Sequence, residues 1–104
     1  DLNYRAKLWK YCDDSHREKV MTELTSYCDI VLGNEEDAEK HFGIHPEGLN
    51  VHKHGHDVKA EAFLSVCKQM MAKFPRAKKV SIEIPQSGII FLIALILFKY
   101  HSLV

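Results

Sequence analysis

The stretch Asp29-Ile-Val-Leu-Gly-Asn-Glu-Glu-Asp-Ala-Glu39 passes from an apolar run to an acidic one within a few residues. Its β-branched run, closed by a glycine, predicts a buried β-strand over residues 29–33. Asn34 is a favourable N-terminal helix cap, and the three carboxylates after it lie where a helix dipole favours negative charge. We therefore expect a helix over residues 35–42, with Gly43 as its C-terminal stop.

An amphipathic helix is predicted upstream of this stretch. Ser15 and Glu18 have the spacing of a capping box, so we expect the helix over residues 15–27. Its apolar residues recur with a period that gathers them on one helical face: Val20, Met21, Leu24, Tyr27 and Cys28. The segment of residues 1–5 is interpreted as the end of a further strand, followed by a loop.

A third helix is predicted over about residues 57–74, with Asp57 as its cap and Pro75 at its end. Its apolar residues again share one face: Phe63, Val66, Cys67, Met70, Met71 and Phe74. Residues 44–56, which contain a proline and two glycines, are expected to form an ordered loop. Residues 78–84 alternate between polar and apolar side chains, which predicts a strand.

This alternation of strands and helices is typical of an α/β fold with a parallel sheet and right-handed crossovers. In such sheets, ligands bind beyond the carboxyl ends of the strands. Two polar groups fall there: Asn3 with Arg5 after the first strand, and Asn34 to Asp37 after the second. We interpret them as the candidate functional site, although a solvated loop and an ordinary helix cap remain open for the same residues.

The composition limits the class of protein. The chain has 104 residues and a formal net charge of 0 at pH 7, which excludes nucleic-acid recognition through a strongly basic surface. Hydrophobic residues make up 46%, which excludes an intrinsically disordered segment. Cys12, Cys28 and Cys67 lack disulfide or metal spacing, and this favours reduced thiols in the cytoplasm. Because the first residue is Asp1 rather than Met, we expect a fragment or a processed chain.

The run from Gly88 to Phe98 contains almost no polar atoms. It is shorter than the about 20 residues that a membrane-spanning helix needs, so we expect no membrane span. A buried strand, a core helix and a segment for self-association all remain open. Because its composition differs from that of the preceding chain, we divide the sequence into a domain of residues 1–84 and an apolar tail of residues 85–104.

Two blocks of the sequence resemble the ribokinase/PfkB carbohydrate kinase family, and most closely its 2-keto-3-deoxygluconate kinase branch. Residues 1–9 have the form D-x-N-x-R-x-x-L-W. The Asp29–Glu39 stretch is similar to the family's D-I-x-x-x-N-x-x-E block, and Phe42-Gly43 matches the F-G that follows it. The two blocks have the family's spacing, and the resemblance covers about residues 1–82.

The resemblance implies a three-layer, ribokinase-like (Rossmann-like) α/β fold, of which this chain would be a partial domain. It also implies phosphorylation of a sugar or sugar-acid hydroxyl with ATP and Mg²⁺. Arg5 would bind the carboxylate of an acidic substrate, and Asn3 would orient Arg5 or the sugar. Asn34 at its helix N-terminus would face the nucleotide phosphates. Asp37 and Glu36 would hold Mg²⁺ through water molecules.

The chain also departs from the family. The glutamate of the second block is Asp37 here, and from residue 83 onward the sequence leaves the family pattern. The family's N-terminal glycine motif, its lid and its Gly-Ala-Gly-Asp anion hole with the catalytic base do not occur in this sequence. We therefore expect no catalytic residue in this chain and no turnover by it. A shifted reading frame or a truncated gene is the hypothesis that explains both the apolar tail and the early stop.

Three further clusters have simpler interpretations. His52, His54 and His56 would share one face of an extended segment and suit Zn²⁺ or Ni²⁺, but a polar loop is the simpler interpretation. Aromatic and apolar side chains near the start are interpreted as a packing cluster: Tyr4, Leu8, Trp9 and Tyr11. Basic side chains late in the chain are interpreted as a solvated helix end: Lys68, Lys73, Arg76, Lys78 and Lys79.

Two hypotheses for function follow. The first is a fragment of an ATP-dependent carbohydrate kinase for a sugar acid such as 2-keto-3-deoxygluconate, in which ATP and the sugar acid are the partners of the full-length enzyme. The second is a non-catalytic α/β interaction module that self-associates through its apolar tail, since exposed apolar runs favour association.

Overall fold

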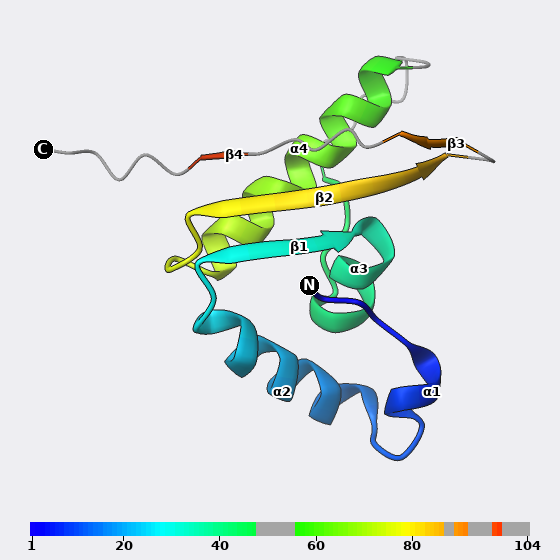
Figure 1. The fold of residues 1–104 in the computed structure, drawn as a ribbon, viewed down its shortest axis with the longest axis vertical. Helices are drawn as coiled ribbons and strands as arrows, with labels where there is room; N and C mark the ends of the chain where they lie inside the picture. The colour runs from blue at the N-terminus through cyan, green and yellow to red at the C-terminus, as the bar shows by residue number, and fades with distance from the viewer. Residues whose placement is uncertain (48–55, 87–88, 92–96, 99–104) are drawn as a thin grey trace, which may run out of the picture.

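The structure is a computed structural model, which describes the backbone of residues 1–47, 56–86, 89–91 and 97–98 and the side chains of residues 1–47 and 61–83. Figure 1 shows the chain as a small sheet with helices packed on it and beside it. The elements follow one another as α1 (Ala6–Trp9), α2 (Asp14–Ser26), β1 (Ile30–Asn34), α3 (Glu35–Phe42), α4 (His56–Lys73), β2 (Lys79–Gln86), β3 (Ile89–Phe91) and β4 (Leu97–Phe98).

β1 and β2 form a parallel pair, with Ile30 opposite Lys79 and Asn34 opposite Glu83. The short strands β3 and β4 both pair antiparallel with β2, so β1 is an edge strand of the described sheet. The chain crosses from β1 to β2 through α3 and α4 (Figure 1). The parallel pairing predicted from the alternation of strands and helices is therefore confirmed for β1 and β2.

The core lies between one face of this sheet and the helices α3 and α4. Every apolar residue of the predicted α4 face is buried: Phe63, Val66, Cys67, Met70, Met71 and Phe74. The ring of Phe42 from α3 meets that of Phe74 edge to face, with 4.9 Å between their centroids. Each fully buried side chain of this size contributes about 1.5–3 kcal/mol, so the predicted face of α4 is confirmed as a major source of stability.

The opposite face of the sheet is open in the part of the chain that the structure describes. Val31 is 3% exposed, whereas its neighbours Ile30 and Leu32 are 54% and 45% exposed. β1 is therefore buried on one face, and the prediction of a strand buried on both faces is wrong. The described elements form two layers, and the third layer that the family resemblance implied is not confirmed among them.

Residues 1–5 do not form the strand end that the sequence suggested. Only Leu2 pairs with the sheet: its N–H donates to the Leu32 carbonyl at 2.8 Å. The backbone of Asn3 then takes a positive φ of 38°, a left-handed conformation that Asn tolerates better than most residues. This turn leads the chain out of the extended conformation, and α1 follows directly.

Helix α2 spans Asp14–Ser26, within one residue of the prediction, but its cap differs. The Asp13 carboxylate accepts the His16 N–H at 2.7 Å, while Ser15 already lies inside the helix. The predicted capping box at Ser15 is therefore wrong. Asp13, whose backbone is extended, caps the helix instead and lies two residues before the predicted cap.

The apolar face predicted for α2 is only partly buried. Met21 packs against the core, but Leu24 and Tyr27 are 58% and 67% exposed. The helix instead packs along α3 through Arg17, whose Nε and Nη2 donate to the Lys40 carbonyl at 3.1 and 3.0 Å. The guanidinium thereby satisfies a carbonyl in the last turn of α3, which has no partner within its own helix.

Several sequence predictions fall where the structure gives little or no description. β2 continues past residue 84 to Gln86, and β3 and β4 are extended, but the side chains of the tail lie outside the described residues. The boundary at residue 84 and the frameshift hypothesis therefore stay predictions. His52 and His54 are also outside the described residues and His56 begins α4, so the metal prediction for them is not tested. No described helix has the length and apolar character needed to cross a membrane.

Arg17→Ala should lower the free energy of unfolding by about 1–3 kcal/mol, because it leaves the Lys40 carbonyl without its charged donors. Asp14→Ala should change it by less than about 0.5 kcal/mol, although Asp14 forms the ion pair with Arg17. The Asp14 side chain is 91% exposed, and exposed ion pairs contribute little. Urea unfolding of both variants measures the difference; equal losses would contradict this account.

Candidate functional site

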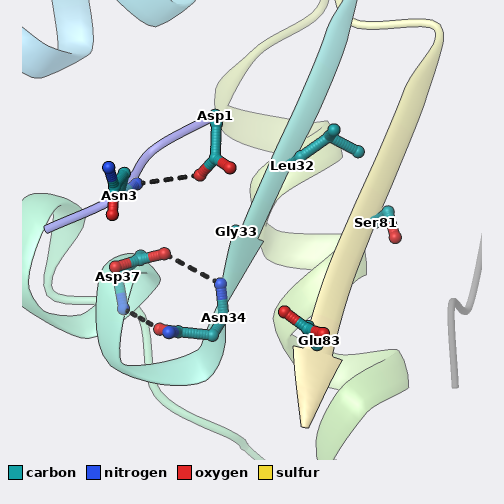
Figure 2. Close-up of a pocket in the computed structure, with 8 residues that line it drawn as sticks. All are labelled: Asp1, Asn3, Leu32, Gly33, Asn34, Asp37, Ser81 and Glu83. Atoms are coloured by element: carbon teal, nitrogen blue, oxygen red, sulfur yellow. Dashed lines mark hydrogen bonds between the residues drawn. The ribbon is translucent and has the colours of Figure 1, made fainter. Parts of the chain in front are cut away.

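A cavity of about 350 Å³ lies at the carboxyl end of β1, beside the middle of β2. Its lining residues come from the chain start, from both strands and from the first turn of α3: Asp1, Asn3, Leu32, Gly33, Asn34, Asp37, Ser81 and Glu83. Figure 2 shows the N-terminal segment and the start of α3 on one side of this cavity and β2 on the other. This is the edge of a parallel sheet at which α/β proteins bind ligands.

A capping box holds the start of α3 at the cavity. The Asn34 side chain accepts the Asp37 N–H at 2.7 Å, and the Asp37 carboxylate accepts the Asn34 N–H at 2.9 Å (Figure 2). At the other end of the helix, Gly43 has a φ of 65°, a left-handed conformation that suits glycine. The predicted cap, the bounds of the helix and its glycine stop are all confirmed.

The Asp37 carboxylate also binds the N-terminal segment, defined as residues 1–9. Its second oxygen accepts the Tyr4 N–H at 2.7 Å, so one side chain joins two parts of the chain that are remote in sequence. The Asp37 side chain is 5% exposed, and an unpaired carboxylate would be costly there. The two backbone donors supply the partners that the buried charge requires.

His41, which lies one helical turn after Asp37 in α3, also binds the N-terminal segment. Its Nε2 lies 3.1 Å from the Leu2 carbonyl oxygen, and its ring meets those of Tyr4 and Trp9 edge to face at 5.4 and 5.9 Å between centroids. Burial is the largest cause that lowers the pKa of His41 below its usual value, and the nearby Arg17 lowers it further. The Leu2 carbonyl and the Asp37 charge act in the opposite direction without overcoming it.

The structure brings together three of the five predicted site residues. Asn3, Asn34 and Asp37 line the cavity. Arg5 and Glu36 do not line it: both are exposed, and Glu36 lies on the solvent side of the first turn of α3. Arg5 nevertheless donates from Nε to the Asn3 side-chain oxygen at 3.2 Å, so Asn3 and Arg5 are in contact as expected. Their roles toward a ligand stay predictions.

Asp1 and Glu83 also line the cavity, and sequence reasoning missed both as site residues. Glu83 sits opposite Asn34 in the β1–β2 register. The alternation in residues 78–84 could have revealed it, because this pattern puts Glu83 on the polar face near the carboxyl end of the strand. The family resemblance covers about residues 1–82 and therefore carries no indication of Glu83.

The carboxylates around the cavity suit a cation held through water. Among the described residues, no group of three His, Cys, Asp or Glu side chains is close enough to ligate a metal ion directly. Mg²⁺ often keeps several of its waters and binds through one or two carboxylates together with phosphate oxygens. Asp1, Asp37 and Glu83 provide such carboxylates, so the residues present fit a hydrated magnesium ion.

The other sequence clusters do not form sites in the part of the chain described. Trp9 and Tyr4 pack on His41 as predicted, but Leu8 and Tyr11 are exposed, so half of the predicted packing cluster is wrong. In the basic cluster, Arg76 pairs with Asp29 at 3.2 Å on the surface. Burial raises the pKa of the Cys67 thiol to about 11, so this cysteine stays protonated near neutral pH.

Comparison with known proteins gives one result that bears on the site. No family model matches the chain, and no curated protein matches it. Among solved structures, the chain is similar to 2-dehydro-3-deoxygluconokinase from Thermotoga maritima, with 35% identity and a TM-score of 0.60. The match covers 82% of this chain and 22% of that kinase, so the chain spans about a fifth of the kinase's length. The likeness supports a relationship to sugar kinases and a partial α/β domain.

The free energy of unfolding should fall as the pH drops below about 6.5. The unfolded chain takes up a proton on His41 near that pH, whereas the folded chain, in which the pKa of His41 is lowered, does not. The stability that the neutral imidazole contributes is complete above about pH 6.5 and is lost as the pH falls toward the folded pKa. Urea unfolding between pH 8 and 5 measures the slope.

His41→Phe should flatten this pH dependence, because the phenyl ring does not titrate. His45→Phe is the matched control, since His45 is exposed and its replacement should leave the slope unchanged. A slope that survives in His41→Phe and disappears in His45→Phe would contradict the assignment to His41.

Proposed function

We propose that the chain is a fragment of an ATP-dependent carbohydrate kinase whose substrate is a sugar acid such as 2-keto-3-deoxygluconate. This compound is the same as 2-dehydro-3-deoxygluconate, which the name of the Thermotoga maritima kinase contains. The observation that carries the proposal is the 35% identity to that kinase over 82% of this chain, together with a polar cavity at the carboxyl end of β1, where it pairs in parallel with β2. The proposal includes a cytoplasmic location and membership of the ribokinase/PfkB family.

The substrate side of the proposed site is the Asn3–Arg5 pair. Arg5 is exposed and its guanidinium makes one hydrogen bond, from Nε to Asn3, which leaves its terminal nitrogens for a ligand. A planar guanidinium binds a carboxylate through two parallel hydrogen bonds, which suits a sugar acid better than a neutral sugar. Asn3, which lines the cavity, accepts the Arg5 Nε–H through its side-chain oxygen.

The nucleotide side of the proposed site is the start of α3. The capping box occupies the N–H groups of Asn34 and Asp37, so the first-turn amides of Glu35 and Glu36 are the donors for a phosphate oxygen. Acidic side chains surround this turn, and they would repel a nucleotide triphosphate unless a cation intervened. Mg²⁺, held through water by Asp37 and Glu83, would supply that neutralisation and orient the phosphates.

The chain by itself is proposed to be inactive. Phosphoryl transfer needs a catalytic base and phosphate donors positioned together with the metal. The sequence contains no Gly-Ala-Gly-Asp motif, and the residues that line the cavity include no nucleophile-activating histidine or lysine. The site is therefore proposed to retain ligand contacts without the chemistry of the complete kinase.

Calorimetric titration of the chain with 2-keto-3-deoxygluconate should detect binding, and Arg5→Ala should weaken it about tenfold or more, because a charged hydrogen-bonding pair is lost. Arg76→Ala is the matched control, since this exposed arginine pairs with Asp29 away from the cavity. In the presence of ATP and Mg²⁺, the chain should form no ADP above the blank. Sugar-dependent ADP formation, or equal binding by the parent and Arg5→Ala, would contradict the proposal.

The second candidate function, an interaction module, is favoured by one observation. The exposed large apolar side chains of the described residues all fall in the sequence between α1 and the middle of β1: Leu8, Tyr11, Leu24, Tyr27, Ile30 and Leu32. Leu24 and Ile30 also line a groove of about 160 Å³ between α2 and the outer edge of β1. The association surface would then include this groove, in addition to the apolar tail of residues 85–104.

Analytical ultracentrifugation distinguishes the two association surfaces. If the groove between α2 and β1 forms the contact, Leu24→Glu should convert a dimer into a monomer, because the charge would be buried without a partner. If the tail forms the contact, Leu24→Glu should stay dimeric and removal of residues 86–104 should give the monomer. A parent chain that is monomeric up to about 100 μM would remove this second function.

A further inference from the structure

The buried polar side chain of His41 contacts the N-terminal segment and α3. It is 1% exposed, and its Nε2 lies 3.1 Å from the Leu2 carbonyl oxygen. Since a carbonyl oxygen only accepts, Nε2 must carry the proton and donate. The neutral ring then has a bare Nδ1, and this atom has no hydrogen-bond partner among the described residues.

The unpartnered Nδ1 makes histidine a poor choice for packing alone. A buried nitrogen without a partner is unfavourable, and a phenyl ring of similar shape would fill the same space without that cost. The one interaction that a phenyl ring cannot supply is the Nε2–H donation to Leu2. The chemistry specific to histidine at this position is therefore the bond to the backbone of the N-terminal segment.

Two further residues contribute to the position of the same segment: Asp37 binds it, and Gly33 leaves room for it. Asp37 accepts the Tyr4 N–H at 2.7 Å, so residues 2 and 4 are both bound to α3, on either side of Asn3. A Cβ placed on Gly33 would lie 2.9 Å from Leu2 Cδ1 and 3.2 Å from an Asp37 carboxylate oxygen, so these side chains would have to shift to admit it. Gly33, Asp37 and His41 thus form a three-residue clamp around residues 2–4.

We propose that His41 is a positioning residue for the acidic substrate: through Leu2 it fixes the turn at Asn3, and with it the direction of Arg5, without touching the substrate itself. The inference rests on the proposed function for its ligand, but the clamp is independent of it. Asn3 has a positive φ, which is less favourable than an extended backbone for a non-glycine residue. Such a turn persists when its neighbours hold it, and Leu2 and Tyr4 are its neighbours.

The His41 contact acts on the substrate side of the site and not on the nucleotide side. The start of α3 is closed by the reciprocal bonds between Asn34 and Asp37, to which His41 contributes nothing. Loss of the His41 donor should therefore weaken binding of a sugar acid and leave the binding of MgATP nearly unchanged. A merely structural role would weaken both, because it would destabilise the fold that carries both halves of the site.

The test compares His41→Phe, which keeps the ring and loses the donor, with His41→Gln, which keeps a donor the same number of bonds from the backbone. His45→Phe is the matched control at an exposed histidine. Two readouts are measured on the full chain: exchange of the Tyr4 amide hydrogen by NMR, and calorimetric affinity for 2-keto-3-deoxygluconate and for MgATP. Amide exchange reports local opening of the segment without any ligand.

In His41→Phe we expect Tyr4 exchange to be about tenfold faster and the sugar-acid affinity about tenfold weaker, with MgATP affinity within about twofold of the parent. His41→Gln should return both altered values to within about threefold of the parent. Unchanged Tyr4 exchange in His41→Phe, or equal losses of both affinities without recovery in His41→Gln, would overturn the proposal. A parent that binds neither ligand contradicts the proposed function instead, and the exchange result alone then decides whether His41 holds the segment.

Discussion

The buried carboxylate of Asp37 is the interaction on which the site depends. Its two oxygens accept the backbone N–H groups of Tyr4 and Asn34, so the N-terminal segment, the end of β1 and the first turn of α3 meet at one charged group. Hydrogen bonds to a charged acceptor are stronger than those between neutral groups, and burial raises the cost of breaking either one. The cavity exists because these three pieces are held together there.

The sequence predicted the parts of this arrangement that depend on local chemistry. Residues that neighbour one another in the sequence predict the strand β1, the cap at Asn34, the helix α3 and its stop at Gly43. The regular spacing of apolar residues in α4 likewise predicts which of its faces is buried. The bond between Asp37 and Tyr4 joins residues 33 positions apart, and no local pattern encodes it. The family comparison pointed to Asp37 as a metal contact, whereas the structure first gives it a role in joining two segments.

Errors of the sequence analysis arose where a tertiary contact outweighed a local preference. The period of α2 predicted an apolar buried face, but the helix packs on α3 through Arg17 and leaves Leu24 exposed. The apolar run in β1 predicted burial on both faces, but the described layers cover only one. Both errors lie on the same side of the molecule, and a chain that spans about a fifth of a similar kinase is expected to leave such surfaces uncovered.

The packing of Trp9 against His41 has a consequence for how this molecule can be observed. Trp9 is the only tryptophan in the chain, and its ring lies 5.9 Å from the imidazole, centroid to centroid. Its emission therefore originates entirely from the segment that carries Asn3 and Arg5, without any label. Fluorescence excited selectively from Trp9 is an optical signal of whether that segment rests on α3 or has left it.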